Sequence, residues 1–231
     1  MADRHSIIKN ATKEIAWQRG KAVTFLAKWN YNAAGSSSHI HQSLWSLDGK
    51  EPKFFDKGAK YGMSEMMRMY VAGLLAHAGE ITYFLAPYIN SYKRFVAGTF
   101  APTKAIWSKD NRTAGYRLCG EGTKGIRIEC RVGGSDLNPY LAMAGTLACG
   151  LLGIREQLKP TEPLASSAQD IGFELPRSLG EALDELEGCR PLRDLMGAGF
   201  VRAYVSVKRK EYETFFRVIS SWEREFLLLN V

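Results

Sequence analysis

The chain has 231 residues, of which 45% are hydrophobic, 11% aromatic and 24% charged. This composition is typical of one large globular domain or two small ones, and it argues against a disordered, collagen-like or coiled-coil protein. No apolar run approaches the roughly 20 residues of a membrane-spanning helix, and the first residues lack the apolar stretch of a signal peptide. The four cysteines are too irregularly spaced for a disulfide framework or a CxxC zinc site. We therefore expect a cytoplasmic protein with reduced thiols and no membrane partner.

The net charge of +7, from 31 basic and 24 acidic residues, has two possible meanings. It can serve solubility alone, or it can attract an anionic partner. The basic residues form no dense run of the kind that binds nucleic acid. Between positions 94 and 131 they are mostly arginines placed singly, which favours a pocket for a small anion over a nucleic-acid surface.

Helical and alternating patterns follow one another along the chain. In the first half they predict a helix over 2–19, a strand over 23–29, an alternating segment over 39–50 that ends in the Asp48-Gly49 turn, and one long helix over 64–86 that begins at Ser64. In the second half they predict strands and loops over 88–132, followed by a helix that begins at the Asn138 cap and ends at about 158. A loop over 159–170 should follow. Next come a short helix capped by Ser178 and Glu181 and a last helix over 200–226. The predicted strands and helices do not alternate strictly along the chain, which indicates an α+β fold.

Three groups of polar residues lie on the predicted strands. In the first, His39, His41 and Ser43 share one face because side chains alternate along a strand. They could bind a metal or a phosphate, or they could be ordinary surface residues.

The second group is the segment 127–131, in which Ile128 and Cys130 alternate with Arg127, Glu129 and Arg131. The polar face could be a plain ion-pair ladder, or a Mg²⁺ ligand beside anion-binding arginines. The third group consists of Arg94, Arg112, Arg117 and Lys124. If these cations converge they imply a bound anion, because burying several cations without anions is costly; spacing alone does not decide this.

Five segments in order resemble the catalytic domain of glutamine synthetases. They are Gly35 to Leu44 (GSSSHIHQSL), Asn90 to Arg94 (NSYKR), Ser108 to Ala114 (SKDNRTA), Arg127 to Arg131 (RIECR) and Asn138 to Ala142 (NPYLA). The similarity extends over nearly the whole chain and is weakest after about residue 158. It implies a large antiparallel sheet flanked by helices, with divalent metals between a nucleotide site and an amino-acid site.

The resemblance also implies roles for individual residues. His39 and Glu129 would be ligands of Mg²⁺ or Mn²⁺. The ATP contacts would be His41, Ser43, Arg112, Arg117, Lys124 and Arg127. The residues that contact glutamate would be Gly35, Arg94 and Arg131. The catalytic residues would be Arg94 and Arg112. The full-length enzyme would be a homo-oligomer.

The chain departs from the family pattern in two respects. It begins where the family's upstream strands would already have ended, so we expect residues 1–231 to be the C-terminal part of a catalytic domain, inactive alone, without the N-terminal domain and the first catalytic strands. In addition, Phe100 stands where the family's flap usually carries a glutamate, and Ala34 where an asparagine is usual. The flap glutamate helps to bind ammonium and to take its proton, which phenylalanine does not do.

The main hypothesis is therefore an ATP-dependent ligase that joins the γ-carboxylate of L-glutamate, through a γ-glutamyl phosphate, to an amine other than ammonia, with Phe100 lining the amine site. The alternatives are ordinary glutamine synthesis from ammonia and a non-catalytic relative that binds or scaffolds.

Overall fold

The computed structural model describes residues 1–96, 98–169 and 174–231. Its only sheet within these ranges has the order β1-β4-β3-β2, built from β1 (Ile40–Gln42), β4 (Arg127–Cys130), β3 (Tyr116–Cys119) and β2 (Trp107–Lys109). β4 pairs antiparallel with both β1 and β3, as expected, whereas β2 pairs parallel with β3. The sheet is therefore mixed, because the chain between β2 and β3 loops back to the same end of the sheet before it re-enters.

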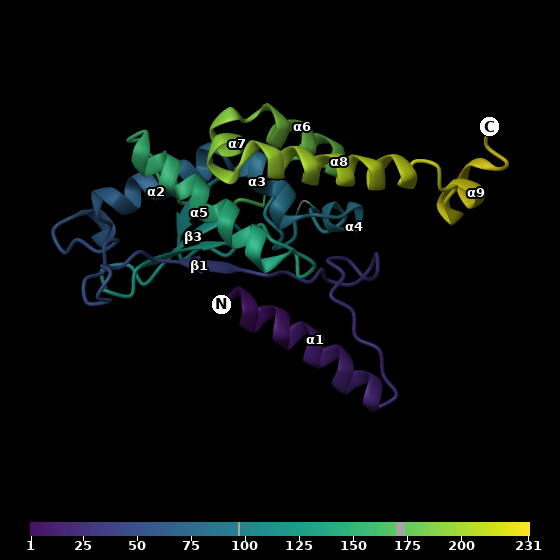
Figure 1. The fold of residues 1–231 in the computed structure, drawn as a ribbon, viewed down its shortest axis with the longest axis horizontal. Coiled ribbons are helices and arrows are strands. Elements are labelled where there is room, and N and C mark those ends of the chain that lie inside the picture. Colours follow the sequence, from purple (N-terminus) through teal and green to yellow (C-terminus); the bar gives the residue numbers. More distant parts are fainter. Residues whose placement is uncertain (97, 170–173) are drawn as a thin grey trace.

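Two layers of helices cover one side of this sheet (Figure 1). The inner layer contains α2 (Glu65–Ala76), α3 (Ala78–Leu85) and α5 (Pro139–Arg155), and the outer one contains α6 (Leu179–Gly188), α7 (Arg190–Met196) and α8 (Ala198–Phe215). α2 and α5 touch through Gly73 and Gly153, since a Cβ on Gly73 would stand 2.1 Å from the carbonyl oxygen of Cys149. The core between sheet and helices is closed by large buried side chains, among them Tyr70, Trp107 and Tyr116.

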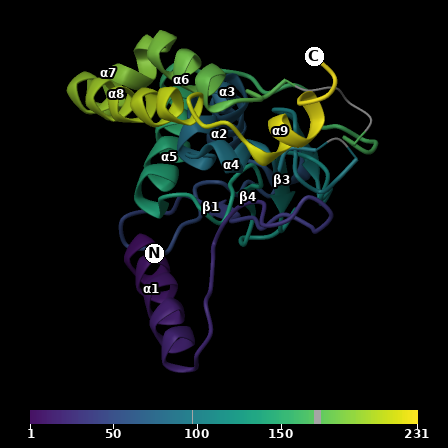
Figure 2. The same ribbon diagram turned by 90° about the vertical axis from the view of Figure 1, so that its right-hand side faces the viewer.

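Two terminal helices lie outside this core. α1 (Ala2–Gln18) has no buried residue and projects away from the body of the molecule in both views (Figures 1 and 2). α9 (Ser221–Leu227) follows a short break after α8 and also buries no residue. The remaining elements are a single helical turn at Lys60–Gly62 and the short helix α4 (Ile89–Tyr92). Among the described residues, none of the helices combines the length and the apolarity that crossing a bilayer requires.

Several predicted elements are confirmed, and the capping and turn residues that the sequence indicated are present. The side chain of Asn138 caps α5 by accepting hydrogen bonds from the backbone N–H groups of Tyr140 and Leu141. Ser178 caps α6 by accepting from the backbone N–H of Glu181. Gly49 has φ +71°, as the predicted turn requires. The loop predicted over 159–170 is irregular as far as residue 169, and residue 170 lies outside the described residues.

Other predictions are wrong. Residues 23–29 form no strand, because they pair with no strand in the described ranges and only Ala27 among them is buried. The helix predicted over 64–86 is broken at His77, which has the non-helical angles φ −115° and ψ 20° although no proline or glycine occupies that position. The last predicted helix is two helices, separated at residues 216–220. The short helices α4 and α7 were not expected.

Candidate active site

A row of polar side chains crosses the sheet on the face opposite the inner helices. The register places His41 of β1 beside Glu129 of β4, and Glu129 beside Arg117 of β3. Ile128 and Cys130, the neighbours of Glu129 in β4, are fully buried in the core. Strand alternation therefore separates the core residues from the polar ones, as the sequence predicted.

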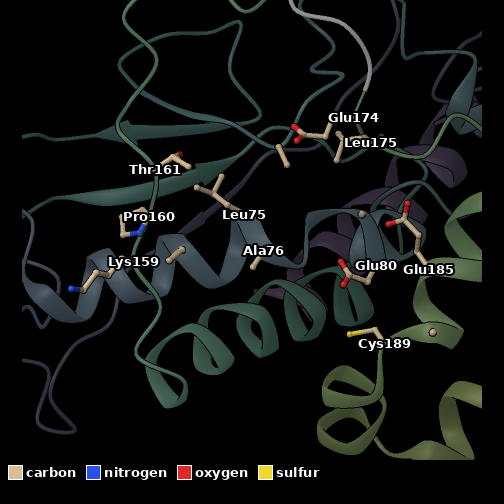
Figure 3. A pocket seen from close by; sticks show the side chains of 14 residues that line it. Leu75, Ala76, Glu80, Lys159, Pro160, Thr161, Glu174, Leu175, Glu185 and Cys189 are labelled. Carbon is tan, nitrogen blue, oxygen red and sulfur yellow. The ribbon is translucent and has the colours of Figure 1, made fainter.

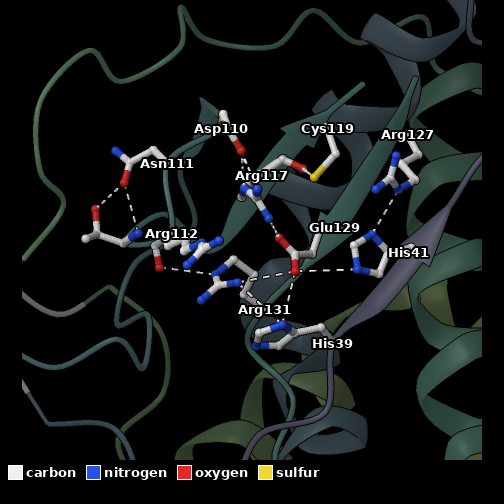
Figure 4. A network of polar contacts seen from close by, with 11 residues as sticks. His39, His41, Asp110, Asn111, Arg112, Arg117, Cys119, Arg127, Glu129 and Arg131 are labelled. Atoms are coloured by element: carbon white, nitrogen blue, oxygen red, sulfur yellow. Dashed lines mark hydrogen bonds and ion pairs between the residues drawn. The ribbon is translucent and has the colours of Figure 1, made fainter. Parts of the chain in front are cut away.

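Glu129 is the centre of this polar row (Figure 4). Its carboxylate oxygen Oε1 lies 3.0 Å from Nδ1 of His39, 3.5 Å from Nε2 of His41 and 3.3 Å from Nη1 of Arg131. Its other oxygen, Oε2, accepts a hydrogen bond of 3.0 Å from Nη1 of Arg117. Glu129 is only 3% exposed, so four cationic or imidazole groups surround one buried carboxylate.

The protonation states follow from this arrangement. Burial alone would raise the pKa of Glu129, but the hydrogen bond from Arg117 and the charge of Arg131 outweigh it, so the pKa lies below its ordinary value. Burial lowers the pKa of His39, and the charge of Arg131 lowers it further against the opposing effect of Glu129. The pKa of His41 is also lowered, mainly by burial. Both imidazoles are therefore neutral near pH 7, which is the form that binds metals.

The donor set fits a hard divalent cation. A carboxylate oxygen and an imidazole nitrogen suit Mg²⁺ or Mn²⁺. Two ligands at adjacent corners of an octahedral site with bonds near 2.1 Å lie about 3 Å apart, which agrees with the 3.0 Å between His39 Nδ1 and Glu129 Oε1. These two residues supply only part of a coordination shell.

The structure brings three of the six predicted basic residues, Arg117, Arg127 and Arg131, to this row. Arg117 also binds Asp110 through two of its nitrogens. Arg127 donates to Nδ1 of His41 over 3.3 Å, and Arg131 donates to the backbone oxygen of Arg112 over 3.2 Å. Their side chains are drawn together in Figure 4.

Two predicted nucleotide residues lie further out. Ser43 is exposed and accepts a hydrogen bond of 3.1 Å from the indole of Trp45. Lys124 is exposed in the turn between β3 and β4. The side chain of Arg112 lines a separate cavity of about 730 Å³ together with Lys109 and Phe100.

A larger cavity of about 1060 Å³ opens beside Glu129. It is lined by residues predicted to contact glutamate (Gly35, Arg94 and Arg131), the metal (His39) and the amine (Phe100). Arg94 is 5% exposed; it donates to the backbone oxygen of Val132, but its buried Nε has no hydrogen-bond partner among the described residues. Burial lowers the pKa of Arg94 to about 10. A buried guanidinium with an unused donor is suited to an anionic ligand.

Phe100 is 66% exposed and lines both cavities. It therefore takes no part in the core. Its side chain is apolar surface at the mouth of the site.

Three polar residues of this region were not predicted as functional. Asn90 holds the cavity wall by bonding both backbone groups of Lys28, at 2.9 and 2.8 Å. Asp110 holds Arg117. Asp136 accepts a hydrogen bond of 2.7 Å from Ser91. The sequence could have indicated Asn90 and Asp110, because each lies inside one of the segments that resemble the family. No sequence pattern around Asp136 indicates a functional role.

Comparisons with known proteins agree with this geometry. The family model of the glutamine synthetase catalytic domain matches residues 1–227. The chain is 40% identical over 222 residues to a gamma-glutamylethanolamide synthetase of Streptomyces coelicolor, covering 96% of this chain and 47% of that protein. It is 39% identical over 231 residues to a glutamine synthetase of Methanococcus maripaludis, covering 96% and 51%.

A third relative is a glutamate–isopropylamine ligase of a Pseudomonas species, 35% identical over 226 residues, covering 96% of this chain and 49% of that protein. Among solved structures, GmaS without ligand superimposes with a TM-score of 0.89 at 31% identity, covering 99% of this chain and 53% of that chain. The chain thus spans about half the length of the curated relatives it matches. On the match over residues 1–227, the chain belongs to the glutamine synthetase family.

Proposed function

We propose that this chain is the C-terminal part of the catalytic domain of an ATP-dependent ligase, which joins the γ-carboxylate of L-glutamate to an amine larger than ammonia. The observation that carries the choice of amine is the position of Phe100, an exposed apolar ring at the cavity that also contains Arg94 and Arg131. Family membership supports the ligase chemistry. The relatives include both ammonia-using and amine-using proteins by their names.

The reaction has two steps. The γ-carboxylate of glutamate attacks the γ-phosphorus of ATP, and ADP leaves. The amine nitrogen then attacks the acyl carbon of the γ-glutamyl phosphate, inorganic phosphate leaves, and the nitrogen loses a proton. Such chemistry depends on positioning the reactants and on stabilising spread negative charge.

The residues of the site would divide this work. Arg94 and Arg131, with Gly35, would hold glutamate in the larger cavity. The nucleotide would be held by His41, Ser43, Arg112, Arg117, Lys124 and Arg127. His39 and Glu129 would hold Mg²⁺ or Mn²⁺, which when bound supplies positive charge for the phosphate oxygens. Arg94 and Arg112 would stabilise charge as it develops in the transition state.

Phe100 favours a larger amine for a physical reason. An ammonium ion needs a carboxylate that stabilises its charge and accepts its proton. A phenyl ring offers apolar area and a cation–π face, both of which favour an alkylated amine. We expect the enzyme to act in the cytoplasm as a homo-oligomer.

Steady-state kinetics of the full-length protein test this proposal. ADP release should require L-glutamate, Mg²⁺ or Mn²⁺, and an amine. Ethanolamine or isopropylamine should give at least about tenfold higher kcat/KM than ammonia, which corresponds to roughly 1.4 kcal/mol of transition-state discrimination. A preference for ammonia would replace the proposal with ordinary glutamine synthesis. ATP and glutamate binding without turnover of any amine would instead indicate a non-catalytic relative.

A further inference from the structure

Away from the sheet, three side chains of different types converge at a junction of helices. His77 lies at the break between α2 and α3, Glu80 lies in the first turn of α3, and Cys189 lies between α6 and α7. Nδ1 of His77 is 3.3 Å from Oε1 of Glu80 and 3.7 Å from Sγ of Cys189, although His77 and Cys189 are 112 positions apart. All three ligand atoms lie within 4.8 Å of one another.

The arrangement is not that of a nucleophile, a base and an orienting acid. In such a relay the nucleophile and the acid contact different nitrogens of the imidazole. Here Glu80 and Cys189 both face Nδ1, while Nε2 of His77 is buried without a hydrogen-bond partner among the described residues. Three donor atoms within 4.8 Å of one another are instead a set that can share one cation.

The distances agree with tetrahedral zinc. Zn–N and Zn–O bonds near 2.0 Å and a Zn–S bond near 2.3 Å, at tetrahedral angles, place the N and O ligands about 3.3 Å apart and the N and S ligands about 3.5 Å apart. The observed separations are 3.3 and 3.7 Å. A thiolate, an imidazole and a carboxylate together select Zn²⁺ over Mg²⁺, which prefers oxygen ligands alone.

The surroundings favour positive charge and allow an ion to enter. A cavity of about 660 Å³ is lined by Glu80, Cys189 and a second carboxylate, Glu185, shown together in Figure 3.

We propose that His77, Glu80 and Cys189 form a Zn²⁺ site, distinct from the hard-metal position at Glu129, which ties the α6–α7 junction to the α2–α3 break. The fourth position would be taken by water or by Glu185. On binding, the Cys189 thiol and the Nδ1–H of His77 each release a proton to solvent as the Zn–S and Zn–N bonds form, while the Glu80 carboxylate binds as it is.

Co²⁺ substitution tests the site directly, because a thiolate bound to Co²⁺ gives a near-ultraviolet charge-transfer band that oxygen and imidazole ligands do not give. Titration of the reduced, full-length protein with Co²⁺ in excess Mg²⁺ should produce this band at one equivalent, and Zn²⁺ should abolish it. Cys189→Ser should abolish the band, and Glu80→Gln should weaken Co²⁺ binding by at least about tenfold. Cys119→Ser removes a similarly buried thiol on β3 and should leave the band unchanged.

Absence of the band in the unsubstituted protein would overturn the proposal, and so would its persistence in Cys189→Ser. The first of these outcomes needs no variant, so a folding defect in Cys189→Ser leaves the test intact. The result is also independent of the ligase proposal, since the amine kinetics do not involve this cavity.

Discussion

Gly35 lies directly against the side chain of Arg94. A Cβ at position 35 would stand 2.6 Å from Cγ of Arg94 and 2.9 Å from the backbone oxygen of Ala27. The resemblance assigned both residues to the glutamate site without saying why one is glycine. The structure supplies the reason, because only a residue without a side chain lets the buried guanidinium of Arg94 pack on this wall.

Gly35→Ala should therefore displace Arg94. Overpacking of this kind costs about 1–3 kcal/mol, and the KM for glutamate should rise more than the KM for ATP. Urea denaturation and steady-state kinetics measure the two effects. Gly58→Ala is the matched control, because its nearest neighbour would be at 3.6 Å, an ordinary contact. Equal stability and equal KM for the two variants would contradict the packing argument.

Glu129→Gln removes the one negative charge at the centre of the polar row. Arg117 and Arg131 would then lack their buried counter-charge, which should cost about 3 kcal/mol or more of unfolding free energy. Mn²⁺ binding should fall as well. Glu121→Gln is the control, since Glu121 pairs with Lys109 at 3.2 Å on the surface, where an ion pair contributes less than about 1 kcal/mol. Similar losses of unfolding free energy in both variants would show that Glu129 is not the buried counter-charge of these arginines.

Asp136 should make stability depend on pH in the direction opposite to that of most carboxylates. Burial raises its pKa against the opposing hydrogen bond from Ser91, and within the part of the chain that the structure describes its Oδ1 has no hydrogen-bond partner. A folded-state pKa above the unfolded value means that the folded protein takes up the proton first as the pH falls. The unfolding free energy of the unsubstituted protein should therefore rise, relative to Asp136→Asn, as the pH drops through that pKa. Urea denaturation of both proteins between about pH 4 and 7 measures this; a constant difference would refute it.

Local patterns predicted the site where alternation within a strand sufficed. In β4 the alternation separated Ile128 and Cys130 from Glu129 and Arg131, and the structure keeps that division. The pattern did not reveal that Glu129 and Arg131 are themselves buried, because their cover comes from the segment around His39 and from the loop at Arg112.

Long-range contacts account for what the sequence did not predict. The alternating segment at 23–29 finds no partner strand among the described residues. It is held instead at Lys28 by Asn90, which lies 62 positions away. The break at His77 is stabilised by Cys189, far along the chain. Neither contact can be read from the periodicity of the sequence, because each depends on how the core places helices and loops that are far apart in the chain.

Phe100 separates the two ligase hypotheses. Phe100→Glu should place a carboxylate at the mouth of the cavity that contains Arg94, where it could stabilise ammonium and accept its proton. The ratio of kcat/KM for ammonia to that for ethanolamine should then rise by at least about tenfold, or roughly 1.4 kcal/mol. The measurement is ADP release by the full-length protein with ammonia and a panel of primary amines.

Phe100→Leu is the matched control for this change. Leucine keeps apolar surface but removes the aromatic ring and adds no charge, so it should lower kcat/KM for the larger amines modestly and leave ammonia use low. Because Phe100 is 66% exposed, neither substitution should alter the free energy of unfolding by more than about 0.5 kcal/mol. If Phe100→Glu and Phe100→Leu shift the amine preference equally, the charge argument fails and size alone governs the acceptor. If neither shifts it, Phe100 does not line the amine site.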